Sequence, residues 1–226
     1  MDDKEKASDV LRKIYSKIDA VVDQVSVKAN VTCKKGCAYC CELLALATFS
    51  EGLLIAEEIL KKPDWRSIAE KMAKQAKETC FDGISEGTYF SRRIRCALLS
   101  GDKLCTIYDI RPACCRCHVV VSDPELCNPD VVTNDRATVD LVQLEKMVWE
   151  FNAVVAAQVS LDPILTAPIP VMVLHTMLAI SIDPEVRKVL MELTVDVPNP
   201  VDWMKKYAAD LTGGKDAKVL STIKIG

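Results

Sequence analysis

The sequence predicts a mainly α fold, in which a helical, bundle-like body carries an irregular, cysteine-rich module with a short β-hairpin. Apolar residues recur at steps of three and four over most of the chain, as they do on the buried faces of amphipathic helices. This periodicity is lost between residues 96 and 130, where short apolar runs alternate with glycine, proline and aspartate. More than half of the 11 cysteines lie in that stretch. We therefore expect a single domain over residues 1–226.

The helical body is expected to lie on both sides of the cysteine-rich module, which covers about 33–130. Seven apolar residues that share one face predict an N-terminal helix over about 5–29. A second apolar stripe begins at Leu141 and indicates a C-terminal helical region over about 135–212. Within that region, further helices are expected at about 168–181, 184–193 and 200–211.

Boundary signals place two helices and the hairpin inside the module. The sequence Thr48-Phe49-Ser50-Glu51 is a capping box, and it begins a helix that runs to about Lys62. Pro63-Asp64 ends this helix and starts the next one. Farther along, two short apolar runs flank a polar turn at 100–103, which predicts the hairpin.

The composition excludes several classes of protein. Half of the 226 residues are apolar, so the chain can bury a substantial core and is not disordered. The 29 basic and 32 acidic residues give a net charge of −3, which argues against binding nucleic acid through its phosphates. The segment 164–182 carries no charged residue, but Pro168 and Pro170 interrupt it. We therefore expect a buried helix there and no association with a membrane.

The cysteines are expected to be reduced thiols in a cytoplasmic protein. The N-terminus is charged and lacks the apolar stretch of a secretory signal peptide. The number of cysteines is odd, and two pairs are adjacent in sequence, Cys40-Cys41 and Cys114-Cys115, where a disulfide between neighbours would be strained. In a reducing compartment, so many cysteines are better explained by metal ligation or redox chemistry than by disulfides.

Four cysteines occur in the order C-x3-C-x2-C-C from Cys33 to Cys41. Gly36 allows a tight turn between them, and so short a loop brings the thiolates toward one metal centre. Cys40 and Cys41 project in different directions, so they either serve two neighbouring ions or leave one thiol as a supporting or reactive group. The first three cysteines also have the spacing of radical-SAM enzymes, but the alternating strands and helices of that fold are missing.

A second set of cysteines lies downstream, and it either completes one centre with the first set or forms another. Cys96 precedes Leu98-Leu99, and Cys105 opens the sequence C-x-I-Y-x-x-R-P-x-x-C-R. With the CxxxCxxCC motif from Cys33 and a later cysteine at Cys127, this order resembles the YkgJ-like cysteine-cluster family, described as zinc- or iron-chelating. The resemblance covers about 33–127 and implies eight metal ligands: Cys33, Cys37, Cys40, Cys41, Cys96, Cys105, Cys115 and Cys127.

The chain departs from the family pattern by adding a cysteine on either side of Cys115, which leaves open which of these sulfurs binds metal. The thiolates carry more negative charge than one or two divalent ions neutralise, so nearby arginines are expected to donate hydrogen bonds to sulfur or to loop carbonyls. A tyrosine is expected to pack against the cysteine loop, and a histidine offers an alternative imidazole ligand. These supporting or alternative positions are Arg111, Arg116, Tyr108, His118, Cys114 and Cys117.

The leading hypothesis is a cytosolic metal-binding protein whose eight-cysteine module holds an iron–sulfur cluster or zinc. The cluster is favoured, because the three leading cysteines suit one and the eight irregularly spaced ligands do not form two C-x2-C knuckles, the pairing common at structural zinc. It would serve redox or cluster-dependent chemistry. A cluster-dependent enzyme that resembles flagellin lysine N-methylase is one alternative, and a zinc or iron carrier or assembly factor is another. No catalytic motif stands out, and metal ions are the partners that the sequence indicates.

Overall fold

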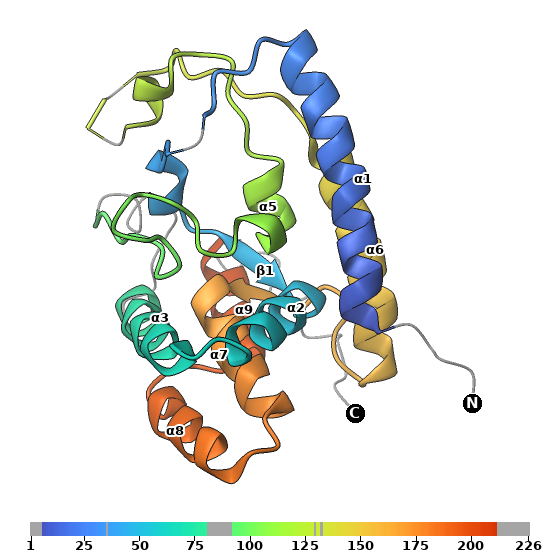
Figure 1. Ribbon diagram of the computed structural model, residues 1–226, viewed down its shortest axis with the longest axis vertical. Coiled ribbons are helices and arrows are strands. Elements are labelled where there is room, and N and C mark those ends of the chain that lie inside the picture. The colour runs from blue at the N-terminus through green and yellow to red at the C-terminus, as the bar shows by residue number, and fades with distance from the viewer. Residues whose placement is uncertain (1–5, 35, 81–91, 129, 132, 212–226) are drawn as a thin grey trace.

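The computed structural model describes residues 6–34, 36–80, 92–128, 130–131 and 133–211, and within them the fold is mainly α, as predicted. Long helices form the body, while the cysteine-rich part consists of short helical turns and irregular chain (Figure 1). The α-helices are α1 (Ala7–Lys28), α2 (Phe49–Leu60), α3 (Trp65–Cys80), α5 (Ala113–Arg116), α6 (Val142–Gln158), α7 (Ile169–Ile180), α8 (Pro184–Thr194) and α9 (Pro200–Leu211). The remaining elements are the 3-10 helices η1 (Tyr39–Glu42), η2 (Tyr108–Ile110) and η3 (Pro124–Cys127), and the strands β1 (Leu46–Thr48) and β2 (Thr166–Pro168).

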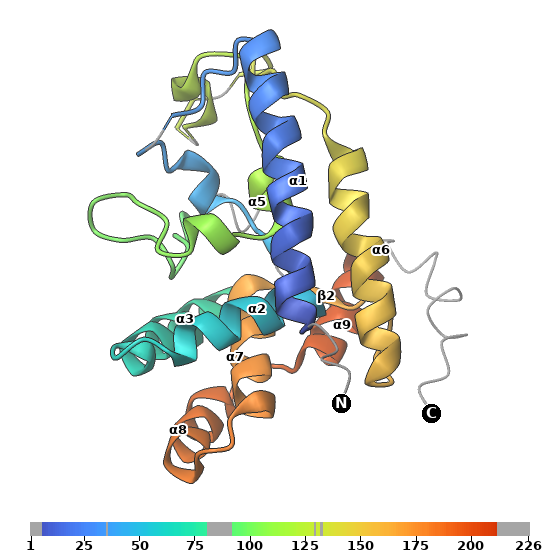
Figure 2. The ribbon, with the colours of Figure 1, turned by 45° about the vertical axis from the view of Figure 1, so that its right-hand side comes forward.

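Helices α1 and α6 lie side by side and run in opposite directions along one flank of the molecule (Figures 1 and 2). Helix α1 follows the predicted apolar stripe, because Leu11, Ile18 and Val22 are buried, together with Tyr15. The C-terminal end of α1 and the N-terminal end of α6 lie at the same end of the pair (Figure 1). The two helices therefore bracket the cysteine-rich part of the chain, which enters from α1 and leaves toward α6.

Helix α7 is the central helix of the core, with α2, α3 and α8 packed around it. Its side chains from Val171 to Leu174 are almost fully buried. Helix α2 comes especially close, since a Cβ atom added at Gly52 would lie 2.5 Å from Cγ of Met172. The buried helix predicted in the uncharged segment is therefore confirmed. Across the described ranges, no helix has the length and apolar character needed to cross a bilayer.

Strands β1 and β2 pair in antiparallel register, with Leu46 opposite Pro168 and Thr48 opposite Thr166. Each strand leads directly into a helix, β1 into α2 and β2 into α7. Thr48 closes the predicted capping box, because its side chain accepts a hydrogen bond from the Glu51 N–H while the Glu51 carboxylate accepts one from the Thr48 N–H. The strand pair, which the sequence did not predict, joins the cysteine-rich half of the chain to the C-terminal half.

The predicted hairpin is present as a tight loop rather than as two full strands. Leu99 and Cys105 form an isolated antiparallel bridge. The backbone N–H of Thr106 donates to the carbonyl of Leu98 over 2.9 Å, and Lys103 makes the turn with a φ of 59°. These bonds hold Cys105 beside the chain that follows Cys96.

Candidate metal centre

Separate stretches of chain meet around the short helix η1, which carries Cys40 and Cys41. In both ribbon views η1 lies between η3 on one side and the hairpin on the other (Figures 1 and 2). Cys127 is the last residue of η3, and Cys105 lies in the hairpin. Cysteines that are far apart in sequence therefore approach η1 from two sides.

Hydrogen bonds fix η1 against both neighbours. The backbone N–H of Cys96 donates to the carbonyl of Cys41 over 2.8 Å, which ties η1 to the segment that leads into the hairpin. On the other side, the hydroxyl of Tyr39 donates to Oε2 of Glu125 over 2.7 Å, which ties η1 to η3. The opening cysteine motif and the downstream cysteines therefore lie in one region of the molecule.

The loop from Cys33 to Cys37 lies beside the chain that leads into η3. The backbone N–H of Val120 donates to Sγ of Cys33 over 3.3 Å, and the N–H of Thr32 donates to the carbonyl of Val120 over 3.0 Å. Gly36 makes the turn before Cys37 with a φ of 86°, a left-handed conformation that favours glycine. The first cysteine of the motif is thus held on the η3 side of η1.

The cysteines of the two sets, Cys33 to Cys41 and Cys96 to Cys127, are free thiols without disulfides. Burial raises the pKa of Cys96 to about 12, and the neighbouring sulfurs of Cys115 and Cys105 add to this increase. Burial also raises the pKa of Cys127, with a further contribution from Cys33. Several thiolates in one place repel each other, so these groups stay protonated until a cation compensates their charge.

Cys40 is the stronger acid of the adjacent pair on η1. Its hydrogen bond with the Cys41 thiol lowers the pKa of Cys40 to about 7, and the positive charge of Arg111 adds to the shift. The same hydrogen bond, together with burial, raises the pKa of Cys41. A thiolate is the form of cysteine that binds metal, so Cys40 is the sulfur of η1 that is most ready to do so.

The cysteines at α5 have different surroundings. Sγ of Cys114 donates to the carbonyl of Leu46 over 3.0 Å and lies 3.9 Å from Sγ of Cys115. The hydrogen bond with Cys114, burial and the nearby sulfur of Cys40 raise the pKa of Cys115. Cys117 instead belongs to the apolar core, where burial and acidic neighbours raise its pKa to about 12. The charges that raise the pKa of Cys115 come mostly from thiols, whereas those that raise the pKa of Cys117 come from carboxylates.

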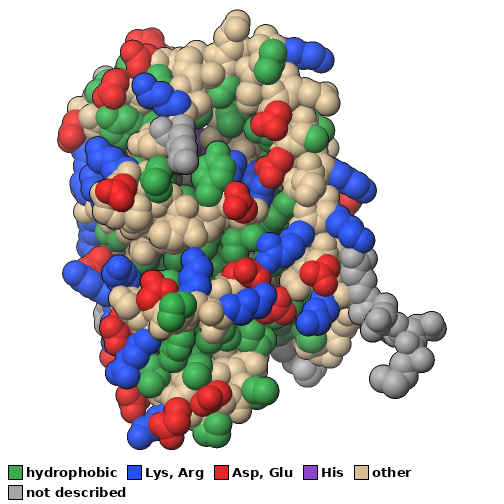
Figure 3. Space-filling model, viewed as in Figure 1, with side chains coloured by type: hydrophobic (Ala, Val, Ile, Leu, Met, Phe, Trp, Pro, Cys, Tyr) green, Lys and Arg blue, Asp and Glu red, His purple; other side chains and the backbone are tan. Residues whose placement is uncertain are grey.

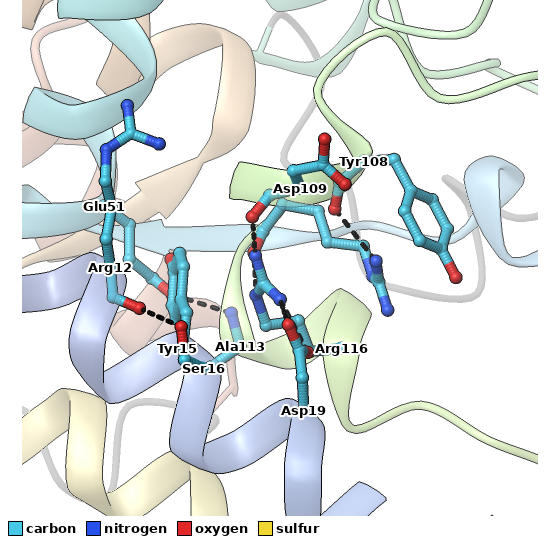
Figure 4. Close-up of polar contacts among 10 residues, drawn as sticks. Arg12, Tyr15, Ser16, Asp19, Glu51, Tyr108, Asp109, Ala113 and Arg116 are labelled. Atoms are coloured by element: carbon cyan, nitrogen blue, oxygen red, sulfur yellow. Dashed lines mark hydrogen bonds and ion pairs between the residues drawn. The ribbon is translucent and has the colours of Figure 1, made fainter. Parts of the chain in front are cut away.

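Arg116 is fully buried, and its hydrogen bonds go to oxygen atoms (Figure 4). Nη1 donates to both carboxylate oxygens of Asp19 over 2.6 and 2.5 Å, Nε donates to the carbonyl of Arg111 over 2.8 Å, and Nη2 donates to the carbonyl of Asp109. The guanidinium also stacks 3.9 Å from the ring centroid of Tyr15. Of the two expected kinds of partner, sulfur and loop carbonyls, Arg116 binds the carbonyls and so ties the loop before α5 to α1.

Glu51 is also buried, and its carboxylate joins α1, α2 and α5 (Figure 4). Oε1 accepts hydrogen bonds from the Tyr15 hydroxyl over 3.0 Å and from the Ala113 N–H over 2.7 Å, while Oε2 accepts one from the Thr48 N–H over 2.8 Å. Burial raises the pKa of Glu51, and these bonds oppose the increase. The capping box in the sequence identifies Glu51 as a capping residue of α2. The residues next to Glu51 in sequence do not indicate its hydrogen bond with Ala113, the first residue of α5.

Replacing Glu51 by Gln should change how the free energy of unfolding depends on pH. The pKa of Glu51 in the folded protein lies above its ordinary value of 4.5, so the folded state holds this proton more tightly than the unfolded chain. The stabilising contribution of protonated Glu51 is therefore complete below the ordinary pKa of 4.5. It declines as the pH rises through the higher pKa that Glu51 has in the folded protein. Denaturation curves from about pH 4 to about pH 8 should show a destabilisation by Glu51→Gln that shrinks as the pH rises.

Glu58→Gln provides a control with the opposite slope. The hydrogen bond from Lys61 and the nearby positive charges lower the pKa of Glu58, so its contribution is present above the ordinary pKa and is lost as the pH falls. A constant difference in stability between wild type and Glu51→Gln across this pH range would contradict the assignment for Glu51.

The other predicted supporting residues lie around the cysteine region. Arg111 stacks on Tyr108, with its guanidinium carbon 3.8 Å from the ring centroid, and Nη1 donates to the Tyr108 carbonyl over 2.8 Å. Tyr108 is 57% exposed, so its contact is with Arg111 at the surface. Burial raises the pKa of Cys105, and the charge of Arg111 partly offsets this increase. His118 is half-buried, and burial lowers its pKa, which keeps the imidazole neutral at pH 7.

The thiols gather without forming a closed coordination shell. Among the residues that the structure describes, no three cysteine, histidine or carboxylate side chains stand close enough to share an ion. A thiolate bound to zinc lies about 2.3 Å from the metal, so the sulfurs must move together on binding. Such closure is expected of loops whose folding is coupled to metal binding. The donor set of reduced thiols suits a soft metal such as zinc or the iron of a cluster.

An α-helical body that gathers free thiols from distant segments defines a cysteine-rich metal-binding protein. Residues 32–138 match the CxxCxxCC family, whose description is "putative zinc- or iron-chelating domain". Over these residues, the match confirms the cysteine-cluster family predicted from the motifs. No curated protein and no solved structure matched the chain.

Proposed function

We propose that the eight-cysteine module holds iron–sulfur rather than zinc and serves electron transfer or cluster-dependent chemistry. The observation that supports one eight-cysteine module is the hydrogen bond between the Cys96 N–H and the Cys41 carbonyl, because it joins the opening motif to the downstream cysteines. The choice of iron–sulfur follows from the C-x3-C-x2-C spacing of the three leading cysteines. The ligands in this proposal are Cys33, Cys37, Cys40, Cys41, Cys96, Cys105, Cys115 and Cys127.

The chemistry of the donors supports this choice. Iron–sulfur clusters accept all-cysteine ligation and, when bound, exchange electrons, whereas structural zinc is redox-inert. The chain contributes partial burial of Cys96 and Cys115, which makes their isolated thiolates unfavourable. Arg111 contributes a positive charge beside Cys105 and Cys40. Burial favours a centre that compensates the charge of these thiolates, and Arg111 offsets part of the negative charge that four thiolates leave on it.

Anaerobic purification followed by iron, zinc and sulfide analysis tests the proposal. We expect a brown protein that contains iron and acid-labile sulfide. A colourless protein with stoichiometric zinc would overturn the cluster and leave a structural zinc module in its place.

Replacing Cys37 by Ser should substantially lower the metal content, because it removes one sulfur of the opening motif. Cys117→Ser is the matched control, since Cys117 is surrounded by apolar and acidic side chains rather than by thiols. Metal analysis of the two purified variants makes the comparison. Equal metal content would contradict the proposed ligand set.

A further inference from the structure

We infer that a polar pocket beside the cysteine module binds a free amino acid. The pocket has a volume of about 300 Å³, at the lower end of the range for small-molecule sites. The residues that line it are Tyr39, Glu42, Arg93, Arg95, Asn128 and Asp130. This ligand goes beyond the proposed function, because its site is built from these polar side chains and not from the metal that the cysteines bind.

The pocket lies directly beside the cysteine module. Four of its lining residues are each next in sequence to a proposed metal ligand, and the pairs are Tyr39–Cys40, Glu42–Cys41, Arg95–Cys96 and Asn128–Cys127. The hydrogen bonds that join η1 to η3 and to the start of the segment before the hairpin also hold the walls of the pocket together. A molecule bound there would lie next to the module without using a cysteine as its contact.

Glu42 positions the two arginines of the pocket. Its side chain is only 12% exposed, and Oε1 accepts a hydrogen bond from Nε of Arg95 over 3.0 Å. Oε2 of Glu42 lies 3.8 Å from Nη1 of Arg93, and Nη2 of Arg93 also pairs with Oδ1 of Asp130. Both oxygens of Glu42 are therefore engaged, so this residue supports the arginines rather than contacting a ligand.

Two side chains of the pocket have donors for a carboxylate. Arg95 donates to Glu42 through Nε alone, and within the described ranges its Nη1 and Nη2 have no partner. These two nitrogens form a planar fork that fits the two oxygens of a carboxylate. Oδ1 of Asn128 accepts the Asp130 N–H over 3.0 Å, which fixes the orientation of the amide and leaves Nδ2 as a further donor.

Two other side chains have acceptors for an ammonium group. The pair of Asp130 with Arg93 uses Oδ1, and Oδ2 of Asp130 has no partner in the part of the chain that the structure describes. The Tyr39 hydroxyl donates its hydrogen to Glu125, so its oxygen can still accept one. The donors and acceptors that the pocket leaves unused therefore match the two charged groups of an α-amino acid.

The charges of the pocket favour a zwitterion over an anion. Two guanidinium groups and two carboxylates line it, so its wall has no net charge. A phosphate carries more than one negative charge at pH 7 and would be repelled by Asp130, whereas an amino acid presents one charge of each sign. On the face in Figure 3, acidic and basic side chains are interspersed among the described residues, which suits local pairing rather than attraction of a polyanion.

Calorimetric titration of the full chain, as purified, with each of the standard amino acids tests the inference. We expect at least one of them to bind in a single site. The best binder should lose at least about tenfold in affinity when it is replaced by its analogue without the amino group, or by its analogue without the carboxylate. The reason is that each of these groups makes a charge-assisted hydrogen bond with the pocket.

Two substitutions at exposed positions assign the contacts. Arg95→Met should weaken binding at least about tenfold and abolish the preference for the amino acid over its analogue without the carboxylate. Asp130→Asn should weaken binding and abolish the preference for the amino acid over its analogue without the amino group. A general loss of structure would not separate the two analogues in this way. Arg66→Met, at an exposed arginine of α3, is the control and should bind as the wild type does.

Three results would overturn the inference. The first is that no standard amino acid binds at about 10 mM, a concentration well above a millimolar Kd. The second is that inorganic phosphate, or the analogue without the amino group, binds as tightly as the amino acid. The third is an unchanged affinity in either variant.

The metal content of the same preparation is measured separately, so the pocket and the proposed function can fail independently. A zinc protein that binds an amino acid would refute the cluster and retain the pocket. An iron–sulfur protein that binds none of the amino acids would refute the pocket and retain the cluster.

Discussion

Chelating the metal from the loaded protein is expected to raise amide hydrogen exchange in residues 36–45 and 96–128 by at least about 100-fold, or about 2.7 kcal/mol of local stability. These stretches contain only η1, η2, α5, η3, the hairpin and the isolated bridge of Val120 with Thr138, so few regular backbone bonds protect them. Metal binding and folding are coupled in such loops. Helix α7 should keep its protection, because it lies in the core among α2, α3 and α8.

Hydrogen exchange followed by mass spectrometry on loaded, chelated and reloaded protein measures this effect. Reloading with metal should restore protection in the two stretches, which separates metal loss from irreversible damage. An equal rise in exchange across α7 and the cysteine region would show that the metal supports the whole fold rather than the module.

Replacing Arg116 by Met is expected to lower the free energy of unfolding by about 3 kcal/mol. Met retains much of the apolar volume but donates no hydrogen bond. The carbonyls of Arg111 and Asp109 would lose a buried donor, and Asp19 would lose its ion pair. Chemical denaturation monitored by circular dichroism measures the loss.

Arg66→Met is the matched control. Arg66 lies on α3 and pairs with Glu70 one helical turn away, with both side chains at least half exposed. Such a surface pair contributes less than about 0.5 kcal/mol. Equal losses of stability in the two variants would contradict the anchoring role of Arg116.

The helices could be predicted because their signals are local. The capping box at Thr48 places the start of α2 correctly, and Pro63-Asp64 correctly separates α2 from α3. The helices α7, α8 and α9 begin and end within one or two residues of the predicted positions. Caps, prolines and apolar periodicity act over a few residues, so they can be recognised without knowledge of the tertiary structure.

The long-range contacts could not be predicted in the same way. Strands β1 and β2 have three residues each, which is too short for an alternating pattern to be visible. Arg116 was expected near sulfur or loop carbonyls because its sequence neighbours are cysteines, but its charge partner Asp19 lies 97 residues away. Only the folded chain shows that this arginine joins the loop to α1.

The candidate site could be predicted from the sequence only in part. The spacing of the cysteines identifies the family. The sequence leaves open which of Cys114, Cys115 and Cys117, in and just after α5, belong to the site. In the structure, Sγ of Cys115 lies 3.9 Å from Sγ of Cys114 and also feels the charge of Cys40, whereas Cys117 is buried in the apolar core. The cause is the rotation of a short helix, which sends neighbouring side chains to different surroundings.

The pairing of β1 with β2 means that the chelating segment cannot be excised as a self-contained unit. β1, α2 and α3 lie inside residues 32–138, whereas their partners β2 and α7 lie outside them. An isolated segment would expose a bare strand edge and the apolar faces of two helices to water. Any transplant of this module into another scaffold must therefore carry β2 and α7 with it.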